Sequence, residues 1–499
     1  MLKPQITEVR DMTSLTKDKL TFKEIEREFY KIGCDVAKML LQRYLEEMDT
    51  ELAGSRDKER LRHKGKKTTA IKTLMGEVSV ERAIYRKVKD EGSQEYVYLL
   101  DEALGLDTIG FMSPNLVEKI VDYSCEMSYR DVAKAVSTLT NQPISHQGVW
   151  NIVQAVGEKQ SDAEKALVDS FKRNKLSGSK EVPVLFEEAD GLWLSMQGKS
   201  REKGSSKGRK ELKLSVTYEG CNQRYPSSKE YKTVGKMAFA GYMTSEEMKC
   251  LRDAAVYQRY NVDEIKYRIL NGDGASWIRR DHDQETDIFQ LDPFHLAQAV
   301  TRNVSDKKLR RPLVKWLKAG EFEKVFKKLE ELKYESGGVA KEVEKLSTLE
   351  QYIKSNLDGI VPYKDREGIT LPDAPEGIEY RTLGTMERQV RVFAARMKGG
   401  KSWSEKGATH LSKIIALKMG EDFKEKIAGL VSGKLPERFT ERYIETLSNS
   451  RSGLKKAVKT SLYPVHRGGL PYTNCSVTRG RKAIRNLFNL KTFSEMIYR

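Results

Sequence analysis

Three acidic residues stand where their carboxylates could share one metal-dependent site. Asp190, in "FEEADG", and Asp273, in "ILNGDGASW", each follow a predicted strand, and Glu387 lies on a predicted helix much later in the chain. If the two strands are neighbours, the aspartates converge and the late helix can supply a third carboxylate. Hard cations such as Mg²⁺ take oxygen ligands, and a pair of such ions supports displacement at a phosphodiester.

Metal binding would also relieve the repulsion among three carboxylates in one pocket. Each acid has a structural alternative. Asp190 precedes a glycine, as in tight hairpin turns, and residues 271–274 contain two such dipeptides in succession. Glu387 could instead pair with Arg391 one helical turn away. Because "ASWIRRDHDQ" after Gly274 lacks strand alternation, we expect a strand that ends at the glycines and presents Asp273 before a short helix.

The stretch "LDPFHLAQAV" predicts a helix with Asp292 as its N-cap and Pro293 as its first residue. His295 then lies in the first turn. It could hydrogen-bond a scissile phosphate or orient an acidic ligand, and a satisfied, partly buried histidine is an equal alternative.

The elements that must position these residues begin at residue 182. We expect two strands about Asp190-Gly191, a third strand in "ELKLSVTYEG", a helix that begins after Thr244, and strands in "KYRILNGDG" and "TDIFQLD" that are each followed by a helix. This order predicts a mixed α/β sheet. Residues 305 to 356 are helical and charged, which predicts an all-helical insertion.

A late helix with an apolar stripe carries Glu387 on its edge. The stripe has a 4,3,4 spacing, as expected for one face of a helix, and consists of Met386, Val390, Phe393 and Met397.

The N-terminal region begins with a long predicted helix over residues 21–50, with Thr21 and Glu24 as a capping box. An apolar stripe with 3,4 spacing follows, made of Phe22, Ile25, Phe29, Ile32, Val36 and Met39. We expect this stripe to pack on its own domain, with a dimer contact as the alternative. The basic run at 55–67 is either a DNA-contacting arm or a solvated linker, and a hairpin is predicted about Gly76.

Residues 115 to 157 predict three short helices arranged as a helix-turn-helix. The second begins at Ser128 with Asp131 in its first turn, and the third follows the short connection "NQPI". In that motif the first turn of the last helix faces the major groove. The expected DNA-binding residues are Ser145, His146, Gln147 and Asn151 on that helix and Arg130 nearer the backbone. A small helical bundle has the same pattern.

Composition agrees with a nucleic-acid partner. The 499 residues carry a formal net charge of +17, and 38% apolar content is enough for a globular protein of about three domains. Five scattered cysteines without a CxxC pair indicate reduced thiols and neither disulfides nor zinc. The start lacks a signal peptide, and no 18-residue apolar run is present, so we expect a cytoplasmic protein with no membrane partner.

Six stretches in order resemble the DDE-type insertion-sequence transposases of the ISLre family and, more distantly, mutator-like transposases. They are "GKKTTAIKTLMGEVSVERAIYRK", "SYRDVAKAV…ISHQGVWNIV", "FEEADGLWLSMQ", "ILNGDGASWI", "LDPFHLAQAV" and "GTMERQVRVFAARMKGGKSWSEKG". The resemblance implies an RNase H-like core interrupted by a helical insertion, with Asp190, Asp273 and Glu387 as acids that hold two Mg²⁺ (or Mn²⁺) ions. "LDPFHL" resembles an Asp-x-x-His signature of the mutator-like group. Three other glutamates compete for the third position: Glu376, Glu379 and Glu405.

The implied activity is transposition. The chain would bind terminal inverted repeats, hydrolyse a phosphodiester at each end with water, and use the resulting 3′ hydroxyl to attack target DNA. A homodimer or larger assembly associated with the nucleoid is expected. The phosphate-holding residues would be the basic 199–210 loop, Arg391, Arg396 and Lys398. The alternatives are an RNase H-like nuclease without strand transfer and a non-catalytic helix-turn-helix DNA-binding protein.

The predicted domain order places a mostly helical DNA-binding region before the α/β core. In full it is an N-terminal helical region (1–55), a basic arm and β-hairpin (56–110), a helix-turn-helix (111–160), the first part of the core (180–304), the helical insertion (305–375), the second part of the core (376–450) and a basic C-terminal tail (451–499).

Overall fold

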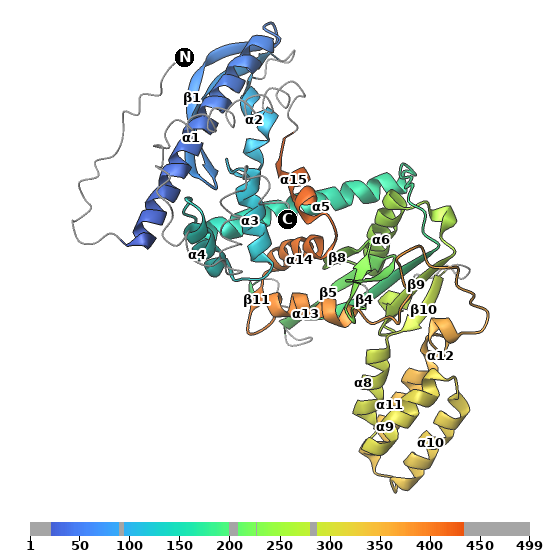
Figure 1. Cartoon of the computed structure of the whole chain (residues 1–499). Coiled ribbons are helices and arrows are strands. Elements are labelled where there is room, and N and C mark those ends of the chain that lie inside the picture. The colour runs from blue at the N-terminus through green and yellow to red at the C-terminus, as the bar shows by residue number, and fades with distance from the viewer. Residues whose placement is uncertain (1–20, 89–93, 199–207, 226, 280–286, 434–499) are drawn as a thin grey trace, which may run out of the picture. The chain divides into compact units, whose positions relative to one another are not determined.

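The computed structural model of the chain (Figure 1) describes residues 21–88, 94–198, 208–225, 227–279 and 287–433. Most of the predicted basic 199–210 loop and the whole of the 451–499 tail lie outside the described residues. None of the helices in the described ranges is long and apolar enough to cross a membrane.

The N-terminal region consists of a long helix against a three-stranded antiparallel sheet. Its elements are α1 (Phe22–Ser55), β1 (Leu61–Thr73), β2 (Gly76–Val88), β3 (Gln94–Val97), α2 (Leu99–Leu104) and a 3₁₀ turn (Leu106–Ile109). The capping box of Thr21 and Glu24 and the hairpin about Gly76 are confirmed. More than half of the basic 55–67 run belongs to strand β1, so it is not a linker.

Two expectations about α1 meet different outcomes. The helix forms where its periodicity predicts, but its 3,4 stripe does not pack on the part of its domain that the structure describes. All six stripe residues are exposed, and α1 instead contacts its domain through Cys34, Leu45 and Met48. The sequence shows that a helix has apolar faces, but not which of them its own domain covers.

Three helices follow, as predicted. They are α3 (Pro114–Ser124), α4 (Tyr129–Leu139) and α5 (His146–Lys172). Ser128 accepts a hydrogen bond from the Asp131 amide, and Ser145 accepts one from the Gly148 amide, so both N-caps are confirmed. α5 extends to Lys172, well past the expected end near residue 158, and it packs against α3, α4 and α6.

A mixed sheet forms the centre of the α/β region. Its strands are β4 (Val184–Met196), β5 (Arg209–Tyr218), β8 (Met237–Gly241), β9 (Tyr267–Gly272) and β10 (Asp287–Leu291), with α6 (Ser245–Arg259), a 3₁₀ turn (Val262–Glu264), α7 (Ser276–Arg279) and α8 (Pro293–Asn303) between or after them. The order across the sheet is β10-β9-β4-β5-β8. β4 runs parallel to β9 and antiparallel to β5, so it is central.

The expectation of two strands about Asp190-Gly191 is wrong. β4 passes through both residues without a turn, and β8 is the third strand of the meander. A Cβ at Gly191 would lie 2.0 Å from Oε1 of Glu211 on the neighbouring strand, so a larger residue here would require the Glu211 side chain to move. Local sequence patterns do not reveal this contact.

Smaller elements border this sheet. β6 (Gly220–Gln223) pairs with β7 (Tyr231–Val234), and β11 (Ser402–Trp403) pairs with β4. The helices α13 (Met386–Met397), α14 (Glu405–Met419) and α15 (Phe423–Val431) come last in the described chain. The predicted α13 stripe is confirmed, since Met386, Phe393 and Met397 are buried in the same core cluster as Leu192 and Leu214 of the sheet.

The predicted all-helical insertion, residues 305–375, is helical as far as Asp365. It comprises α9 (Lys307–Lys318), α10 (Phe322–Glu335), α11 (Ala340–Lys354), α12 (Leu357–Ile360) and a 3₁₀ turn (Tyr363–Asp365), and residues 366–385 contain no helix. Leu313, Leu329 and Leu349 belong to one buried cluster with Phe289 and Leu291 of β10. The insertion therefore shares a core with one edge of the sheet (Figure 1).

Candidate active site

Strand register brings Asp190 and Asp273 together. β4 and β9 pair in parallel with Glu188 opposite Asn271. Two residues further along each chain lie Asp190 and Asp273, and side chains two positions apart project from the same face of a sheet. Two carboxylates separated by 83 positions are therefore neighbours at the end of β9.

Local hydrogen bonds fix both aspartates. Asp190 Oδ1 accepts from the Gly191 amide at 2.7 Å, and Asp273 Oδ1 accepts from the Ala275 amide at 2.9 Å. The second bond turns the chain from β9 into α7, and Gly274 makes the turn with a φ of +88°. "NGDG" is thus the end of a strand, as expected, and not a hairpin.

His295 lies beside Asp190, with 3.9 Å between its Nε2 and Oδ2 of the carboxylate. It stands in the first turn of α8, whose predicted N-cap Asp292 accepts from the Phe294 amide at 2.7 Å. The pKa of His295 is raised, first by the neighbouring carboxylate of Asp190 and then by the carboxylates of Asp292 and Asp273, against the opposing effect of burial.

A further carboxylate, Glu211 on β5, was missed from the sequence. Burial raises its pKa, and the carboxylates of Asp273 and Asp190 raise it further, while Lys213 acts in the opposite direction. The available signal was weak, because Glu211 and Lys213 look like ordinary polar positions on an alternating strand. Its pKa shift is therefore mainly an effect of burial, with a smaller contribution from the two aspartates.

Glu387 is not among the carboxylates that the structure brings together. It lies in the first turn of α13, and Arg391 pairs with it at 3.0 Å, which is the helical alternative raised above. The competing glutamates are engaged or exposed elsewhere. Glu405 binds Lys210 at 2.8 Å, Glu379 lies 3.6 Å from Arg381, and Glu376 is exposed.

The fully buried carboxylate of Glu188 accepts hydrogen bonds from the start of α13, the helix that carries Glu387. Glu188 accepts from the backbone amides of Thr385 and Met386 at 3.1 and 2.9 Å, and from the Thr385 hydroxyl at 2.8 Å. It also accepts from Tyr218 Oη at 2.6 Å. A negative charge at the positive end of a helix is stabilising, so Glu188 acts as the N-terminal cap of α13 from a strand 197 residues earlier.

One amide joins this cap to the helix that carries His295. Nδ2 of Asn271 donates to Glu188 at 3.2 Å and to Asp292 at 3.0 Å. Asp292 caps α8 and Glu188 caps α13, so the first turns of both helices are tied to the same buried residue of β9. Glu188 and Asn271 lie two residues before Asp190 and Asp273 along their strands. Their polar network holds the first turns of the helices that carry His295 and Glu387.

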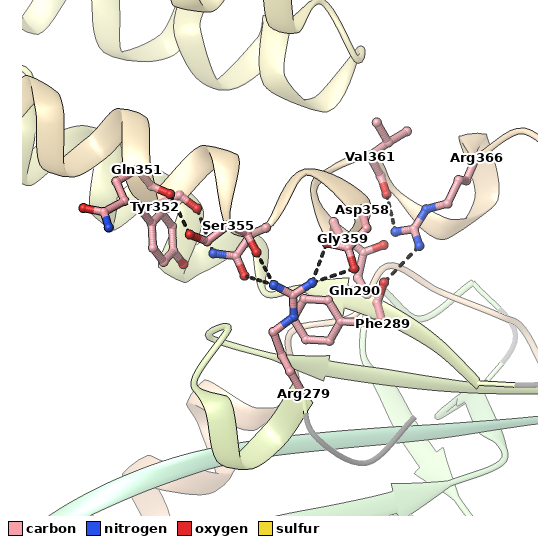
Figure 2. A network of polar contacts seen from close by, with 11 residues as sticks. Arg279, Phe289, Gln290, Gln351, Tyr352, Ser355, Asp358, Gly359, Val361 and Arg366 are labelled. Atoms are coloured by element: carbon pink, nitrogen blue, oxygen red, sulfur yellow. Dashed lines mark hydrogen bonds and ion pairs between the residues drawn. The ribbon is translucent and has the colours of Figure 1, made fainter. Parts of the chain in front are cut away.

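The insertion is fastened to the same region (Figure 2). Arg279, which ends α7, donates to Asp358 at 2.6 Å and to the carbonyl of Ser355, and its guanidinium lies 4.7 Å from the centre of the Phe289 ring. Tyr352 Oη donates to the carbonyl of Asp273 at 3.0 Å. The C-terminal end of α11 thereby holds the backbone of the second aspartate.

The predicted DNA-binding residues of the helix-turn-helix region are accessible. Arg130, Ser145, His146, Gln147 and Asn151 are all exposed on α4 and α5. Gln147 Nε2 donates to Asn151 Oδ1 at 3.0 Å, so these two side chains already face the same way.

Of the three predicted phosphate-binding residues on and after α13, two are exposed. They are Arg391 and Lys398. Arg396 requires a correction, because it is buried and its Nε donates to the carbonyl of Ser124 at 2.7 Å. This guanidinium joins α13 to α3 and cannot reach a phosphate while that packing holds.

The donor chemistry at the two aspartates suits a hard divalent cation. Within the described part of the chain, however, no three His, Cys, Asp or Glu side chains are grouped so that they could hold a metal ion. Of the three predicted ligands, Asp190 and Asp273 are neighbours in the strand register and Glu387 is paired with Arg391.

The fold and the site define a mixed α/β protein with paired aspartates at the junction of two parallel strands. A family model matches residues 15–428, and the chain therefore belongs to the uncharacterised protein family UPF0236. The "UPF0236 protein in vanSb 3'region" of Streptococcus gallolyticus is 25% identical over 416 residues, which cover 81% of this chain and 84% of that one.

Two solved structures are distant matches. The Drosophila P element transposase strand transfer complex matches with 9% identity and a TM-score of 0.21, over 66% of this chain and 86% of that chain. A pre-cleavage Mos1 transpososome matches with 10% identity and a TM-score of 0.11, over 36% and 58%.

Proposed function

We propose that this chain is a DDE-type transposase of the ISLre kind, with an RNase H-like core that cuts and joins DNA. The observation that carries the proposal is the side-by-side placement of Asp190 and Asp273 at the end of β9, with His295 3.9 Å from Asp190. Two acids far apart in the sequence, together with a histidine, are what a metal-dependent phosphodiester site requires.

Each residue has a role in this proposal. Asp190 and Asp273 would hold the metal with Glu387 as the third ligand, and bound Mg²⁺ would supply activation of the attacking oxygen and stabilisation of the leaving one. His295 would donate a hydrogen bond to a phosphate oxygen or orient Asp190. Attack by water on phosphorus breaks its bond to the 3′ oxygen and leaves a 3′ hydroxyl, which then attacks a phosphorus of target DNA and displaces the 3′ oxygen of the target strand.

The position of Glu387 sets one requirement. The Met386 amide at the start of α13 donates to Glu188, and Glu188 projects from the same face of β4 as Asp190. Glu387 must exchange Arg391 for the metal, and Arg391 would then be free to hold a DNA phosphate. The first turn of α5 would read the terminal repeats, with His146, Gln147 and Asn151 toward the bases.

A second candidate is a non-catalytic DNA-binding protein. The observation that favours it is the lack of a grouped set of three metal-binding side chains among the described residues. This candidate requires only the exposed residues of α4 and α5 and the charge of +17. A nuclease that cuts without joining is the third, and the product of the reaction distinguishes it.

The test uses labelled DNA that carries the terminal inverted repeats of the element. In Mg²⁺ the full chain should nick this DNA and join the 3′ end to a second duplex. Asp190→Asn and Asp273→Asn should each lower cleavage by about 10²- to 10³-fold, since removal of one strong transition-state interaction has effects of this size.

The matched control is Asp162→Asn, which changes an exposed carboxylate on α5. Cleavage unaffected by Asp190→Asn and Asp273→Asn would refute the catalytic assignment. Cleavage that depends on both residues without any joined product would identify a nuclease.

A further inference from the structure

The long helix α1 has two apolar faces, and the described residues of its own domain pack against one of them. Cys34, Leu45 and Met48 are buried where α1 packs on β2 and α2. Oδ2 of Asp49 accepts from the Ala83 amide of β2 at 3.0 Å and anchors the same side of the helix. This face is therefore the internal face of α1.

The other face is exposed along its whole length. The exposed fractions are 79% for Phe22, 71% for Phe29 and 62% for Met39, and Ile25, Ile32 and Val36 are also exposed. Exposed apolar residues scattered singly need no explanation, but a continuous stripe of six large side chains marks an interaction surface.

The stripe follows a heptad repeat. Phe22, Phe29 and Val36 occupy positions a, and Ile25, Ile32 and Met39 occupy positions d. Cys34, Leu41 and Met48 all occupy position f, which is nearly opposite to the a/d seam on a helical wheel. The domain thus covers the f side of α1 and leaves the seam of a coiled coil open to solvent.

We propose that this face binds the same face of a second copy of this chain, as a parallel two-stranded coiled coil. A heptad seam is self-complementary, because a and d side chains of one helix fit between those of an identical helix. The proposal concerns assembly alone and does not depend on the DNA chemistry proposed above.

The charges beside the seam favour the parallel arrangement. Glu28 and Asp35 occupy positions g, while Gly33 and Leu40 occupy positions e. In a parallel pair each g residue faces an e residue of the partner, so the acids meet a glycine and a leucine. An antiparallel pair would place g against g and bring Glu28 toward Asp35 of the other copy.

The seam from Phe22 to Met39 is about 26 Å long at 1.5 Å per residue. That is shorter than a free-standing coiled coil, which needs three to four heptads. Here the helix is already formed, because the capping box at Thr21 starts it and the internal face holds it against β2. Association therefore does not carry the cost of helix nucleation.

The test is the oligomeric state of the full chain by sedimentation over a micromolar concentration range. The wild-type chain should form a concentration-dependent dimer. Phe29→Glu combined with Val36→Glu should shift it to a folded monomer with the helix content of the wild type, since both side chains are exposed. A wild-type chain that is monomeric throughout, or a double variant that dimerises as the wild type does, overturns the proposal.

The matched control is Arg27→Glu with Lys31→Glu, which places two glutamates at the exposed f and c positions of the same helix. It should dimerise like the wild type, and its dissociation would show that added charge alone separates the chains and would overturn the assignment to the seam. If residues 1–20 of the same chain covered the seam, the wild type would be monomeric and the seam variant would melt at a lower temperature.

Cross-linking tests the direction of the two helices. Cysteines at the same d position face each other only in a parallel pair, so Ile32→Cys should form a disulfide-linked dimer under mild oxidation. Lys31→Cys, one residue away at position c, should remain uncross-linked, as should the native chain. A dimer that fails to cross-link through Ile32→Cys refutes the parallel arrangement.

Discussion

Asp190 and Asp273 owe their proximity to strand register. The position of Asp273 at the end of a strand could be predicted, because the residues after Gly274 lack alternation. The continuity of β4 through Asp190 could not, because a glycine after an aspartate is typical of a turn. The glycine lies beside the Glu211 side chain of β5, and no local pattern reveals such a contact.

At His295 the direction of the pKa shift gives a prediction. In EDTA its pKa should lie above the ordinary value of 6.5, because the Asp190 carboxylate lies 3.9 Å from its Nε2 and the carboxylates of Asp292 and Asp273 act in the same direction. Since the folded protein raises this pKa, the stabilising contribution is fully present below about pH 6.5 and is lost as the pH rises through the folded-state value. An NMR titration of the imidazole, assigned with His295→Gln, measures it.

Two further titrations give this measurement its controls. Asp190→Asn should return the pKa of His295 toward 6.5, because it removes the largest cause of the shift. Added Mg²⁺ should also lower it if the cation binds the aspartates, because positive charge opposes protonation. A wild-type value at or below 6.5 in EDTA would contradict the geometry.

At the scale of elements, local capping signals were reliable. Thr21, Ser128, Ser145, Thr244 and Asp292 each cap the helix that the sequence predicts, because cap and helix are adjacent in the chain. α13 lacks such a signal. Thr385 makes no side-chain cap, and the carboxylate that serves the helix comes from Glu188 on β4. Tertiary caps of this kind are beyond sequence patterns.

Glu188→Gln tests that tertiary cap. The substitution keeps the shape but removes the charge and turns an amide NH₂ toward backbone donors, so buried hydrogen bonds are lost. We expect the free energy of unfolding to fall by about 2 to 3 kcal/mol, as measured by denaturant titration. Under the proposed function, DNA cleavage should also fall, because the start of α13 positions Glu387.

The control for this variant is Glu246→Gln. Glu246 is exposed in the first turn of α6, and its change should cost no more than about 0.5 kcal/mol. Equal unfolding free energies for the two variants would show that Glu188 does not hold α13.

At the scale of the whole molecule, composition predicted a polyanionic partner but not where the excess charge would act. Part of the basic 55–67 run lies on the exposed positions of β1, whereas Arg396 is buried against α3. Net charge is a property of the chain, and the fold decides which cations remain available.

The salt dependence of DNA binding tests this distribution. With a net charge of +17, affinity should fall steeply as salt rises, because each neutralised phosphate releases a counterion. Lys398→Ala should weaken binding to all sequences and reduce the slope of log affinity against log salt by about 1, the expected value for one lost phosphate contact. Fluorescence anisotropy over a salt series gives the slope.

Asn151→Ala is the variant to compare with Lys398→Ala, because Asn151 is proposed to contact bases and Lys398 a phosphate. It should lower the preference for terminal-repeat DNA over random DNA by about 1 to 3 kcal/mol and leave the salt slope unchanged. The two variants thus move different observables in one assay. If Asn151→Ala changed the slope and not the preference, the first turn of α5 would be a phosphate contact, and the helix-turn-helix assignment would lose its basis.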